Sequence, residues 1–406
     1  MSSRYEIPSL NSTAKTHLCA LPFLALSLVA LTGCNRKPAS TTADIAKPPA
    51  KPKVAEVDLR AYKPNEAGTI MIVMYHRFDK KYPSNDRNLN RRPEDFQKDL
   101  ENLYQRKYYP VNVSDIVEGK LDVPAGKTPI ALTFDDSWDT QFKLIAGTDG
   151  QPHIDPECAV GIMEKFHKAH ADWPMKGTFF VLPQEGRNGP TFYQSDSVDQ
   201  KLGYLIKSGY EVANHTATHS SLRGKSADKV QWEIATAIKD IRAIDKTAPM
   251  QILALPYGQL PGKGVQKYLS EGESGGVRYK NNAVLLAAWR PIMSPYTQNN
   301  KKVTDRGRFA AFNPLRLERI KPDPTQAAVP GTFEYWLAYY DLNPGRRYIS
   351  DGNPKVVSVP KAFQSQVDPA AVQRMGLTLQ IYSLDAGKPG LGGAAGTPTG
   401  GGLSVQ

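Results

Sequence analysis

Two adjacent carboxylates, Asp135 and Asp136, follow directly after the apolar run 129–134, Pro-Ile-Ala-Leu-Thr-Phe. A β-prone run of this kind is expected to form a buried strand that delivers both acids to its carboxyl end. Two ionised groups at the end of a buried strand are tolerated only where water, a cation or hydrogen bonds receive them. Taken alone, the pair is better explained by an acidic turn, so its meaning depends on what lies near it.

Two histidines, His215 and His219, stand four residues apart directly after a second apolar run at 210–214. On a helical turn, side chains at this spacing face the same way, and two imidazoles can bind one cation. With Asp136 they would form a site of two histidines and one carboxylate that leaves positions open for water and substrate. Two histidines at this spacing can also be a surface coincidence. Because both motifs end apolar runs, we interpret them as one metal site.

These motifs need elements that bring them together, and the chain alternates short apolar runs with amphipathic stretches. Strands are expected at 69–75, 129–134, 177–182, 210–214, 251–255 and 283–288. Helices are expected at 93–106, 160–170, 199–208 and 226–244. This alternation predicts an α/β fold with a parallel sheet, most simply a (β/α) barrel. In such barrels the chemistry gathers at the carboxyl ends of the strands, where both motifs lie.

Three segments of the chain resemble the first three motifs of the polysaccharide deacetylases, the carbohydrate esterase family 4 enzymes that share the NodB homology domain. They are Thr133-Phe134-Asp135-Asp136, His215-Thr216-Ala217-Thr218-His219 and Leu255-Pro256-Tyr257-Gly258. Tyr75-His76-Arg77-Phe78 and 309–321 resemble parts of longer bacterial members, so the resemblance covers about 67–325. It implies a distorted (β/α) barrel of the NodB type that binds a divalent metal, usually zinc. It also implies hydrolysis of N-acetyl or O-acetyl groups on a polysaccharide.

The resemblance also assigns roles to single residues. It makes Asp135 the general base, and it makes Asp136, His215 and His219 the metal ligands. A ligand carboxylate is occupied by the metal, while its neighbour stays free to take a proton from activated water. In the family a backbone N–H near the position of Tyr257 stabilises the oxyanion of the tetrahedral intermediate.

The chain departs from the family pattern at Ser137-Trp138, where the first motif usually continues with glycine, and in two features that concern the base and the acid. The family commonly has an arginine that steers the base two residues before the proline of the third motif, and this chain has Ala254 there. Arg290, after the expected strand 283–288, is our candidate for a replacing cation and a substrate contact. The family's last motif supplies a histidine acid, but His219 is the last of the seven histidines in this chain. His76 is therefore our candidate acid, with a substrate contact or a structural hydrogen bond as alternatives. Activity would then be weaker, or restricted to an O-acetyl leaving group.

Three tryptophans are candidates for stacking on sugar rings, namely Trp138, Trp173 and Trp289. Packing in the core is an equally good explanation for each of them, because tryptophan is mostly buried on average. With Tyr257 and Arg290, Trp138 completes the set that we expect to bind substrate.

The first 33 residues are expected to be a signal peptide of the lipoprotein type. An apolar run at 21–31 is too short to span a bilayer comfortably, and Leu31-Thr32-Gly33-Cys34 resembles a bacterial lipobox. Lipidated Cys34 would then begin a flexible tether rich in Pro, Lys and Ala at 34–66. The barrel is expected at 67–385, and a disordered Gly-rich tail at 386–406. This organisation predicts a protein anchored by lipid to a membrane of the bacterial envelope, on the periplasmic or the outer-membrane side.

The formal charge of +11 would suit an anionic partner, but no run of five or more basic residues occurs. A diffusely basic surface is the simpler explanation, and we expect no nucleic-acid partner. The leading hypothesis is a metal-dependent hydrolase that removes acetyl groups from an envelope or extracellular polysaccharide. The alternative is a catalytically impaired barrel that binds glycan during polysaccharide assembly or tethering. Asp135 favours the enzyme, because a binding module needs no base beside a metal.

Overall fold

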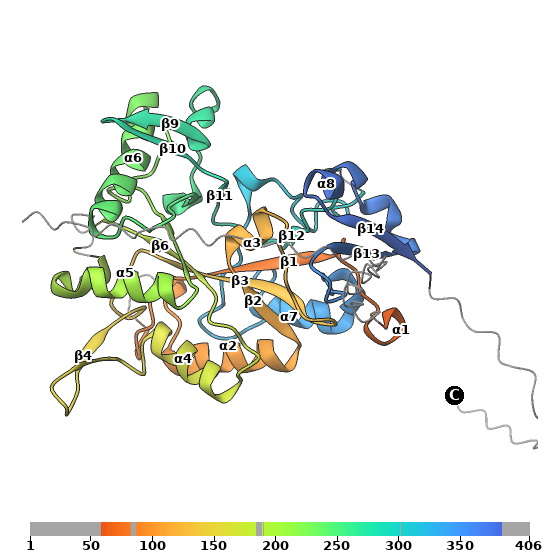
Figure 1. Cartoon of the computed structure of the whole chain (residues 1–406), viewed down its shortest axis with the longest axis horizontal. Coiled ribbons are helices and arrows are strands. Elements are labelled where there is room, and N and C mark those ends of the chain that lie inside the picture. Colours follow the sequence, from red (N-terminus) through yellow and green to blue (C-terminus); the bar gives the residue numbers. More distant parts are fainter. Residues whose placement is uncertain (1–57, 83–86, 184–188, 190, 301, 384–406) are drawn as a thin grey trace, which may run out of the picture. The chain divides into compact units, whose positions relative to one another are not determined.

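A curled, mostly parallel sheet forms the centre of the computed structural model, which describes residues 58–82, 87–183, 189, 191–300 and 302–383 (Figure 1). Within these residues the sheet has eight strands, in the order β11-β8-β7-β6-β3-β1-β12, with β2 also beside β3. Their bounds are β1 Thr69–Tyr75, β2 Tyr108–Val111, β3 Thr128–Asp135, β6 Thr178–Val181, β7 Glu211–Asn214, β8 Ile252–Ala254, β11 Ala283–Leu285 and β12 Ile292–Met293. All neighbours are parallel except β12, which pairs antiparallel with β1. The six predicted strands are confirmed, with ends that shift by at most three residues.

Burial on both faces explains why these strands read as continuous apolar runs. All seven residues of β1 and all eight of β3 are buried, as expected for parallel strands covered on both sides. The register pairs Tyr75 with Phe134, Asp135 with Phe180, and Val181 with Asn214. The carboxyl ends of β1, β3, β6 and β7 therefore lie at one edge of the sheet.

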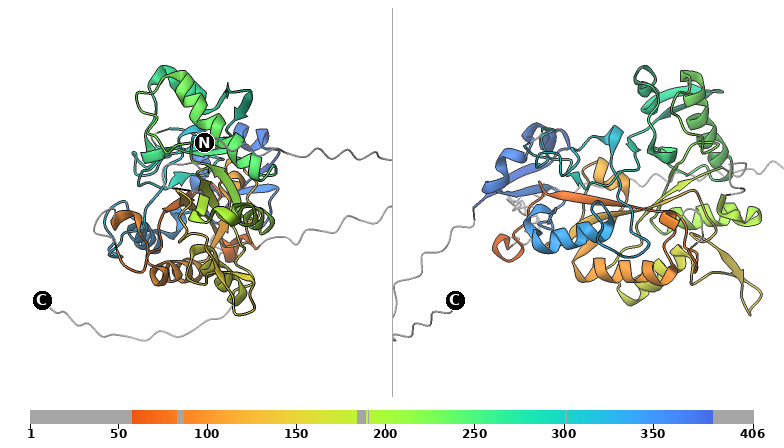
Figure 2. Two further views of the ribbon diagram at one scale, coloured as in Figure 1. Left: turned by 90° about the vertical axis from the view of Figure 1, so that its left-hand side faces the viewer. Right: turned by 180° about the vertical axis from the view of Figure 1, so that it is seen from behind.

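The four predicted helices are confirmed as α2 Pro93–Gln105, α4 Ala159–Ala169, α5 Val198–Lys207 and α6 Ala227–Ile244. In α2, Pro93 occupies the first turn, and Phe96, Leu100 and Leu103 form the buried face. Further helices are α1 Leu59–Tyr62, α3 Val113–Val117, α7 Phe333–Leu342 and α8 Pro369–Arg374. Helices α2 and α4 lie side by side on one flank of the sheet (Figure 1 and Figure 2).

Three small strand pairs lie outside the central sheet. The antiparallel pair β9 Glu271–Ser274 and β10 Val277–Lys280 packs against α6, as Figure 2 shows. A second antiparallel pair consists of β4 Leu144–Ala146 and β5 Pro152–Ile154. Strands β13 Val356–Pro360 and β14 Thr378–Tyr382 pair in parallel near α8.

The segment 317–320 links the two sides of the curled sheet. Leu317 forms a parallel bridge with Leu285 of β11, and Ile320 forms one with Val73 of β1. The Ile320 N–H donates to the Ile72 carbonyl at 2.8 Å, and the Leu286 N–H donates to the Leu317 carbonyl at 2.8 Å. The predicted distorted (β/α) barrel is thus the observed fold, with an irregular segment where a regular strand would stand.

Residues 58–66, which we expected to belong to the tether, are folded in this structure. Asp58 caps α1, and the Glu66 carboxylate is buried, where it accepts from the Tyr348 hydroxyl at 2.9 Å and the Ser358 N–H at 2.8 Å. The predicted signal peptide, Cys34 and the tail 386–406 lie outside the described residues. Among the helices described, none combines the length and apolar character that a membrane crossing requires.

Candidate metal and catalytic site

The turn after β3 carries the two carboxylates. Asp135 ends the strand, and both Asp136 and Ser137 adopt left-handed backbone conformations, with φ of 76° and 53°. The Ser137 hydroxyl accepts from the Leu182 N–H at 2.9 Å, and the Ser137 carbonyl accepts from the Phe192 N–H at 2.9 Å. Strained backbone of this kind persists only where its surroundings hold it, and it is frequent at functional sites.

The histidine motif lies on a loop after β7, and our expectation of a helical turn is wrong. The Asn214 side chain accepts from the Thr216 N–H at 2.8 Å, and Thr216 has a φ of 69°, which a helix does not allow. Thr218 donates to the buried Glu233 of α6 through its N–H at 2.9 Å and its hydroxyl at 2.6 Å. The loop 215–219 is therefore shaped by side-chain bonds that the spacing of the histidines does not reveal.

This loop nevertheless brings both imidazoles to Asp136. The Oδ1 atom of Asp136 lies 3.1 Å from His215 Nε2 and 3.0 Å from His219 Nε2. One ligand atom from each of the three residues lies within 4.8 Å of the others, and all three side chains are buried. His215 also donates from Nδ1 to the Ala254 carbonyl at 2.9 Å, a partner typical of the second nitrogen of a metal-bound imidazole.

The donor set fits a divalent cation. Because Nδ1 of His215 donates its hydrogen to Ala254, Nε2 of the neutral ring is a bare acceptor that faces a carboxylate oxygen. Two acceptors at this distance repel each other unless a proton or a cation lies between them. Burial lowers the pKa of His215, but Asp135 and then Asp136 outweigh it and raise the pKa. For the Asp136 carboxyl, burial raises the pKa. The hydrogen bonds with His215 and His219 outweigh burial and hold the pKa of Asp136 well below its usual range.

Asp135 is held by an arginine that the sequence reasoning missed. Arg319, on the segment 317–320, is fully buried and donates from its two terminal nitrogens to both carboxylate oxygens of Asp135, at 2.6 and 2.8 Å. Burial alone would raise the pKa of Asp135, but Arg319 lowers it below the ordinary value. Arg319 lies within the stretch 309–321, which resembles part of the longer bacterial family members. That resemblance was the one feature of the sequence that could have pointed to Arg319 as the partner of Asp135.

Arg290, our candidate for this cation, does not contact Asp135. Its guanidinium pairs with Glu318 and donates to the Gly307 carbonyl at 3.0 Å. That prediction is wrong, because the side chain of Arg290 is already bound to a nearby carboxylate.

His76 follows β1 and lies at the mouth of the barrel, as expected from its position after a strand. Its Nε2 is 3.9 Å from Asp135 Oδ2, so the two side chains face each other without a direct hydrogen bond. Burial lowers the pKa of His76, and the nearby Asp136 and Asp135 oppose that shift only in part. The imidazole is therefore placed to exchange protons with the base, and it favours the neutral form.

Trp138 contacts the metal-site carboxylate itself. Its indole Nε1 donates to Asp136 Oδ2 at 3.3 Å. Its ring stacks on Tyr193 with centroids 5.2 Å apart, and the Arg77 guanidinium lies 4.8 Å from its centroid. These contacts suit a residue that orients the carboxylate of Asp136, a candidate metal ligand. This role would come in addition to the substrate contact that we predicted for Trp138.

Tyr257 stands at the rim of the site. Its ring is 53% exposed and its centroid lies 5.0 Å from that of His219. Its backbone is left-handed, with φ of 60°, and Gly258 follows with φ of 65°. A Cβ atom on Gly258 would meet the Ala287 backbone nitrogen at 2.4 Å, so only glycine fits this close approach.

The remaining two tryptophans differ in exposure. Trp173 is 2% exposed and belongs to the hydrophobic core, so core packing is the correct explanation for it. Trp289 is 63% exposed and lies near the carboxyl end of β11.

Comparison with known proteins agrees with this site. The family model described as polysaccharide deacetylase matches residues 122–272, a range that contains both carboxylates, both histidines and Tyr257. Similar solved structures include the deacetylase PplD of Streptococcus pyogenes in complex with acetate, at 18% identity and a TM-score of 0.43, covering 64% of this chain and 96% of that one. The polysaccharide deacetylase BC0361 of Bacillus cereus shows 15% identity and a TM-score of 0.44, covering 64% and 67%. IcaB of Ammonifex degensii shows 15% identity and a TM-score of 0.41, covering 68% and 99%.

At these TM-scores no argument about the chemistry of this chain rests on the structural likenesses. The family match and the motifs carry the assignment, because the match spans the segments that hold the candidate ligands and the base. Residues 122–272 therefore match the polysaccharide deacetylase family, and this match supports a deacetylase enzyme.

Proposed function

We propose that this chain is a metal-dependent hydrolase that removes acetyl groups, as N-acetyl and also as O-acetyl, from a polysaccharide of the cell envelope or its surroundings. The observation that supports the proposal is a buried triad of two imidazoles and one carboxylate beside a second carboxylate, Asp135. A structural site needs no second carboxylate, whereas hydrolysis needs a base next to the activated water.

Asp136, His215 and His219 would hold the ion, for which we propose zinc, since nitrogen and oxygen donors in a three-residue set are typical of catalytic zinc. The chemistry that a bound ion supplies here is activation of water and polarisation of the acetyl carbonyl. Trp138 and Ala254 act on the ligands, because their hydrogen bonds fix the orientations of the Asp136 carboxylate and the His215 ring.

Asp135 takes a proton from the attacking water. Arg319 keeps this carboxylate ionised and holds both of its oxygens in one orientation, so the base is ready before substrate arrives. His76 then serves as the acceptor of that proton and passes it to the leaving alcohol or amine. A neutral imidazole suits this relay, because its unprotonated nitrogen can accept the proton that Asp135 has taken from water.

The backbone N–H of Tyr257 is our candidate donor to the oxyanion. The left-handed turn at Tyr257 and Gly258 brings this backbone to the carboxyl end of β8, beside His219. A backbone donor in a preorganised turn stabilises the negative charge that develops on the acetyl oxygen.

One sequence feature favours a second candidate, a glycan-binding barrel with impaired catalysis. The chain contains no histidine after His219 that could act as the family's usual acid. The two functions differ in turnover, since a binding barrel would take up metal and glycan but release no acetate.

The deciding experiment measures acetate released from partially acetylated glucosamine oligomers and from acetylated xylan, with zinc or cobalt added. The wild type is compared with Asp135→Asn, which keeps the ligands but removes the base. We expect release by the wild type and a loss of about a thousandfold or more in the variant. A wild type that binds metal and releases no acetate from any of these glycans would favour the binding barrel.

We also propose that lipidated Cys34 anchors the protein to a membrane of the bacterial envelope, on the basis of the lipobox-like segment at 31–34. Cell fractionation of the wild type and of Cys34→Ser tests this. We expect the wild type in the membrane fraction and the variant released from it.

A further inference from the structure

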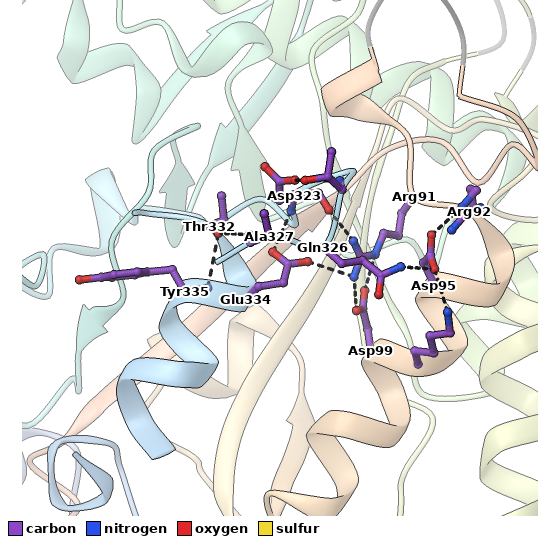
Figure 3. Close-up of polar contacts among 12 residues, drawn as sticks. Arg91, Arg92, Asp95, Asp99, Asp323, Gln326, Ala327, Thr332, Glu334 and Tyr335 are labelled. Carbon is purple, nitrogen blue, oxygen red and sulfur yellow. Dashed lines mark hydrogen bonds and ion pairs between the residues drawn. The ribbon is translucent and has the colours of Figure 1, made fainter. Parts of the chain in front are cut away.

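A buried network of charged side chains joins helix α2 to the segment that follows Arg319 (Figure 3). Its centre is Arg91, which is 4% exposed and donates to the Asp99 carboxylate from Nε at 2.8 Å and from a second nitrogen. The guanidinium also donates to the Asp323 carbonyl at 2.7 Å and pairs with Glu334 of α7 at 3.1 Å. No step of the deacetylation chemistry proposed above uses these charges.

The network holds the backbone of Asp323 at both of its polar atoms. The Asp323 N–H donates to the Glu334 carboxylate at 2.8 Å, and the Asp323 carbonyl accepts from Arg91. Hydrogen bonds that involve a charged group are stronger than neutral ones. Asp323 stands four residues after Arg319, and Ile320 between them makes two backbone bonds with β1, both of 2.8 Å. The segment 317–323 is therefore attached to β1 and, three residues further on, to the charged network.

The same network is attached to the carboxyl end of β1. The Tyr75 hydroxyl donates to the Asp99 carboxylate at 3.1 Å, and the Arg91 N–H donates to the Arg77 carbonyl at 2.9 Å. Tyr75 and Arg77 are the two chain neighbours of His76. The guanidinium of Arg91 therefore connects the end of β1 to the segment that carries the arginine of the base.

Stability alone is a weak reason for this arrangement. Burying two carboxylates with one guanidinium is costly, and apolar side chains of similar volume often stabilise a protein as well or better. The cost is visible at Asp99, where burial raises the pKa to about 6 although Arg91 acts to lower it. Fixing the register of neighbouring segments is the best-attested use of buried charges of this kind.

We propose that Arg91 is a positioning residue that acts on the base Asp135 through Arg319. This inference rests on the proposed function, because it concerns the same base. By fixing the segment 317–323 at one register along β1, Arg91 keeps the guanidinium of Arg319 in line with both oxygens of Asp135. A displacement of about 1 Å far from the chemistry can lower a rate about a hundredfold, so turnover depends on this register.

The first test compares acetate release from N-acetylglucosamine oligomers by the wild type and Arg91→Lys. The lysine keeps the charge but lacks the planar fork that holds Asp99 and Asp323 together. We expect kcat to fall about tenfold while KM and zinc content stay constant. The matched control is Arg106→Lys, which weakens an exposed ion pair between the end of α2 and Asp341 of α7 and should keep the wild-type kcat. Wild-type kcat in Arg91→Lys would overturn the proposal.

The second test separates action through Arg319 from a general structural role. We combine Arg91→Lys with Arg319→Lys, which already removes the orientation of Asp135. If Arg91 acts through Arg319, the double variant is no slower than Arg319→Lys alone. A further tenfold loss in the double variant would show an independent effect and overturn the proposal. If Arg91→Lys does not fold, Glu334→Gln takes its place in both tests, because it has the same volume and removes only the charge that pairs with Arg91.

The third test needs no turnover and uses amide hydrogen exchange, read by mass spectrometry. We expect the peptides that contain Met74 and Ile320 to exchange about tenfold faster in Arg91→Lys, and those from β7 and β8 to be unchanged. Arg106→Lys should match the wild type throughout. Unchanged exchange in Arg91→Lys would overturn the positioning proposal and leave the deacetylase proposal standing. Faster exchange of these peptides beside a wild type that releases no acetate would support the role of Arg91 in holding the segment and remove the enzyme.

Discussion

Arg319 and Asp135 are 184 residues apart in the sequence and form a bidentate ion pair, with nitrogen–oxygen distances of 2.6 and 2.8 Å. The same guanidinium donates to the Thr133 hydroxyl at 3.3 Å and to the Leu286 carbonyl at 3.2 Å. The pair thus links the base to strand β3 and to the segment that follows β11. It supplies a cation to Asp135, where the family resemblance led us to expect an arginine at the position of Ala254.

Substitutions of Arg319 should separate two effects on Asp135, the orientation of its carboxylate by two parallel hydrogen bonds and the neutralisation of its charge. Arg319→Lys keeps a cation but cannot present two parallel donors, so Asp135 loses its fixed orientation. We expect kcat/KM to fall about a hundredfold while the metal content stays constant. Arg319→Met leaves the buried carboxylate unpaired and should lower the free energy of unfolding by about 3–5 kcal/mol. Arg290→Lys, which alters the pair with Glu318 and the bond to the Gly307 carbonyl but does not touch Asp135, is the control. Wild-type kcat/KM in Arg319→Lys would contradict the steering role.

Loss of either histidine should abolish stoichiometric metal binding. We expect His215→Ala and His219→Ala to lose bound zinc in elemental analysis, because only two ligands remain in each variant. Zinc at a hundred times its dissociation constant should raise the free energy of unfolding of the wild type by about 2.7 kcal/mol. This stabilisation is measured as a higher unfolding temperature. His153→Ala removes an exposed histidine paired with Asp149 and serves as control. Unchanged stoichiometry in His215→Ala would rule out the ligand assignment.

Trp138→Phe should distinguish the two roles open to this side chain. The variant keeps an aromatic ring beside Tyr193 but removes the hydrogen bond to Asp136. If Trp138 orients the ligand, metal affinity falls about tenfold, as is typical for partners of metal ligands. A rise in KM for oligosaccharides with unchanged metal affinity would instead identify a pure substrate contact. A competitive metal titration and a KM measurement on the same protein decide between the two.

Lys201 should make stability depend on pH above neutrality. Its side chain is fully buried, with its ammonium 5.6 Å from the Phe192 ring centroid and donating to the Phe192 carbonyl at 3.2 Å. Burial lowers its pKa from 10.5 to about 8. Between these two values the unfolded chain binds more protons than the folded one, so the free energy of unfolding rises with pH.

The comparison protein for this effect is Lys201→Met, which has similar volume and no charge. We expect the free energy of unfolding of the wild type, relative to this variant, to rise by about 3 kcal/mol from pH 8 to 10.5. Urea unfolding at several pH values measures this difference. A difference that is flat across this range would show that the folded protein keeps Lys201 charged.

Much of the fold and the metal site could be predicted because both leave local marks in the sequence. Buried parallel strands must be continuously apolar, so β1 and β3 are visible as runs that end at His76 and at Asp135. Because parallel strands end at one edge, Asp136, His215 and His219 were expected together before any geometry was known. The exact conformation of the loop 215–219 was not predictable, since it depends on Glu233 of α6.

The sequence by itself determined the parallel sheet, the candidate metal ligands and the candidate base, because each is encoded in a short pattern of neighbouring residues. Only the tertiary structure decided which arginine serves Asp135, since 317–320 reaches both β1 and β11 without the pattern of a strand. It also decided which tryptophan is core and which is surface, because exposure depends on what packs around each ring. Trp173 is enclosed by the core, whereas Trp289 is held at the surface by Gly331 and Trp336.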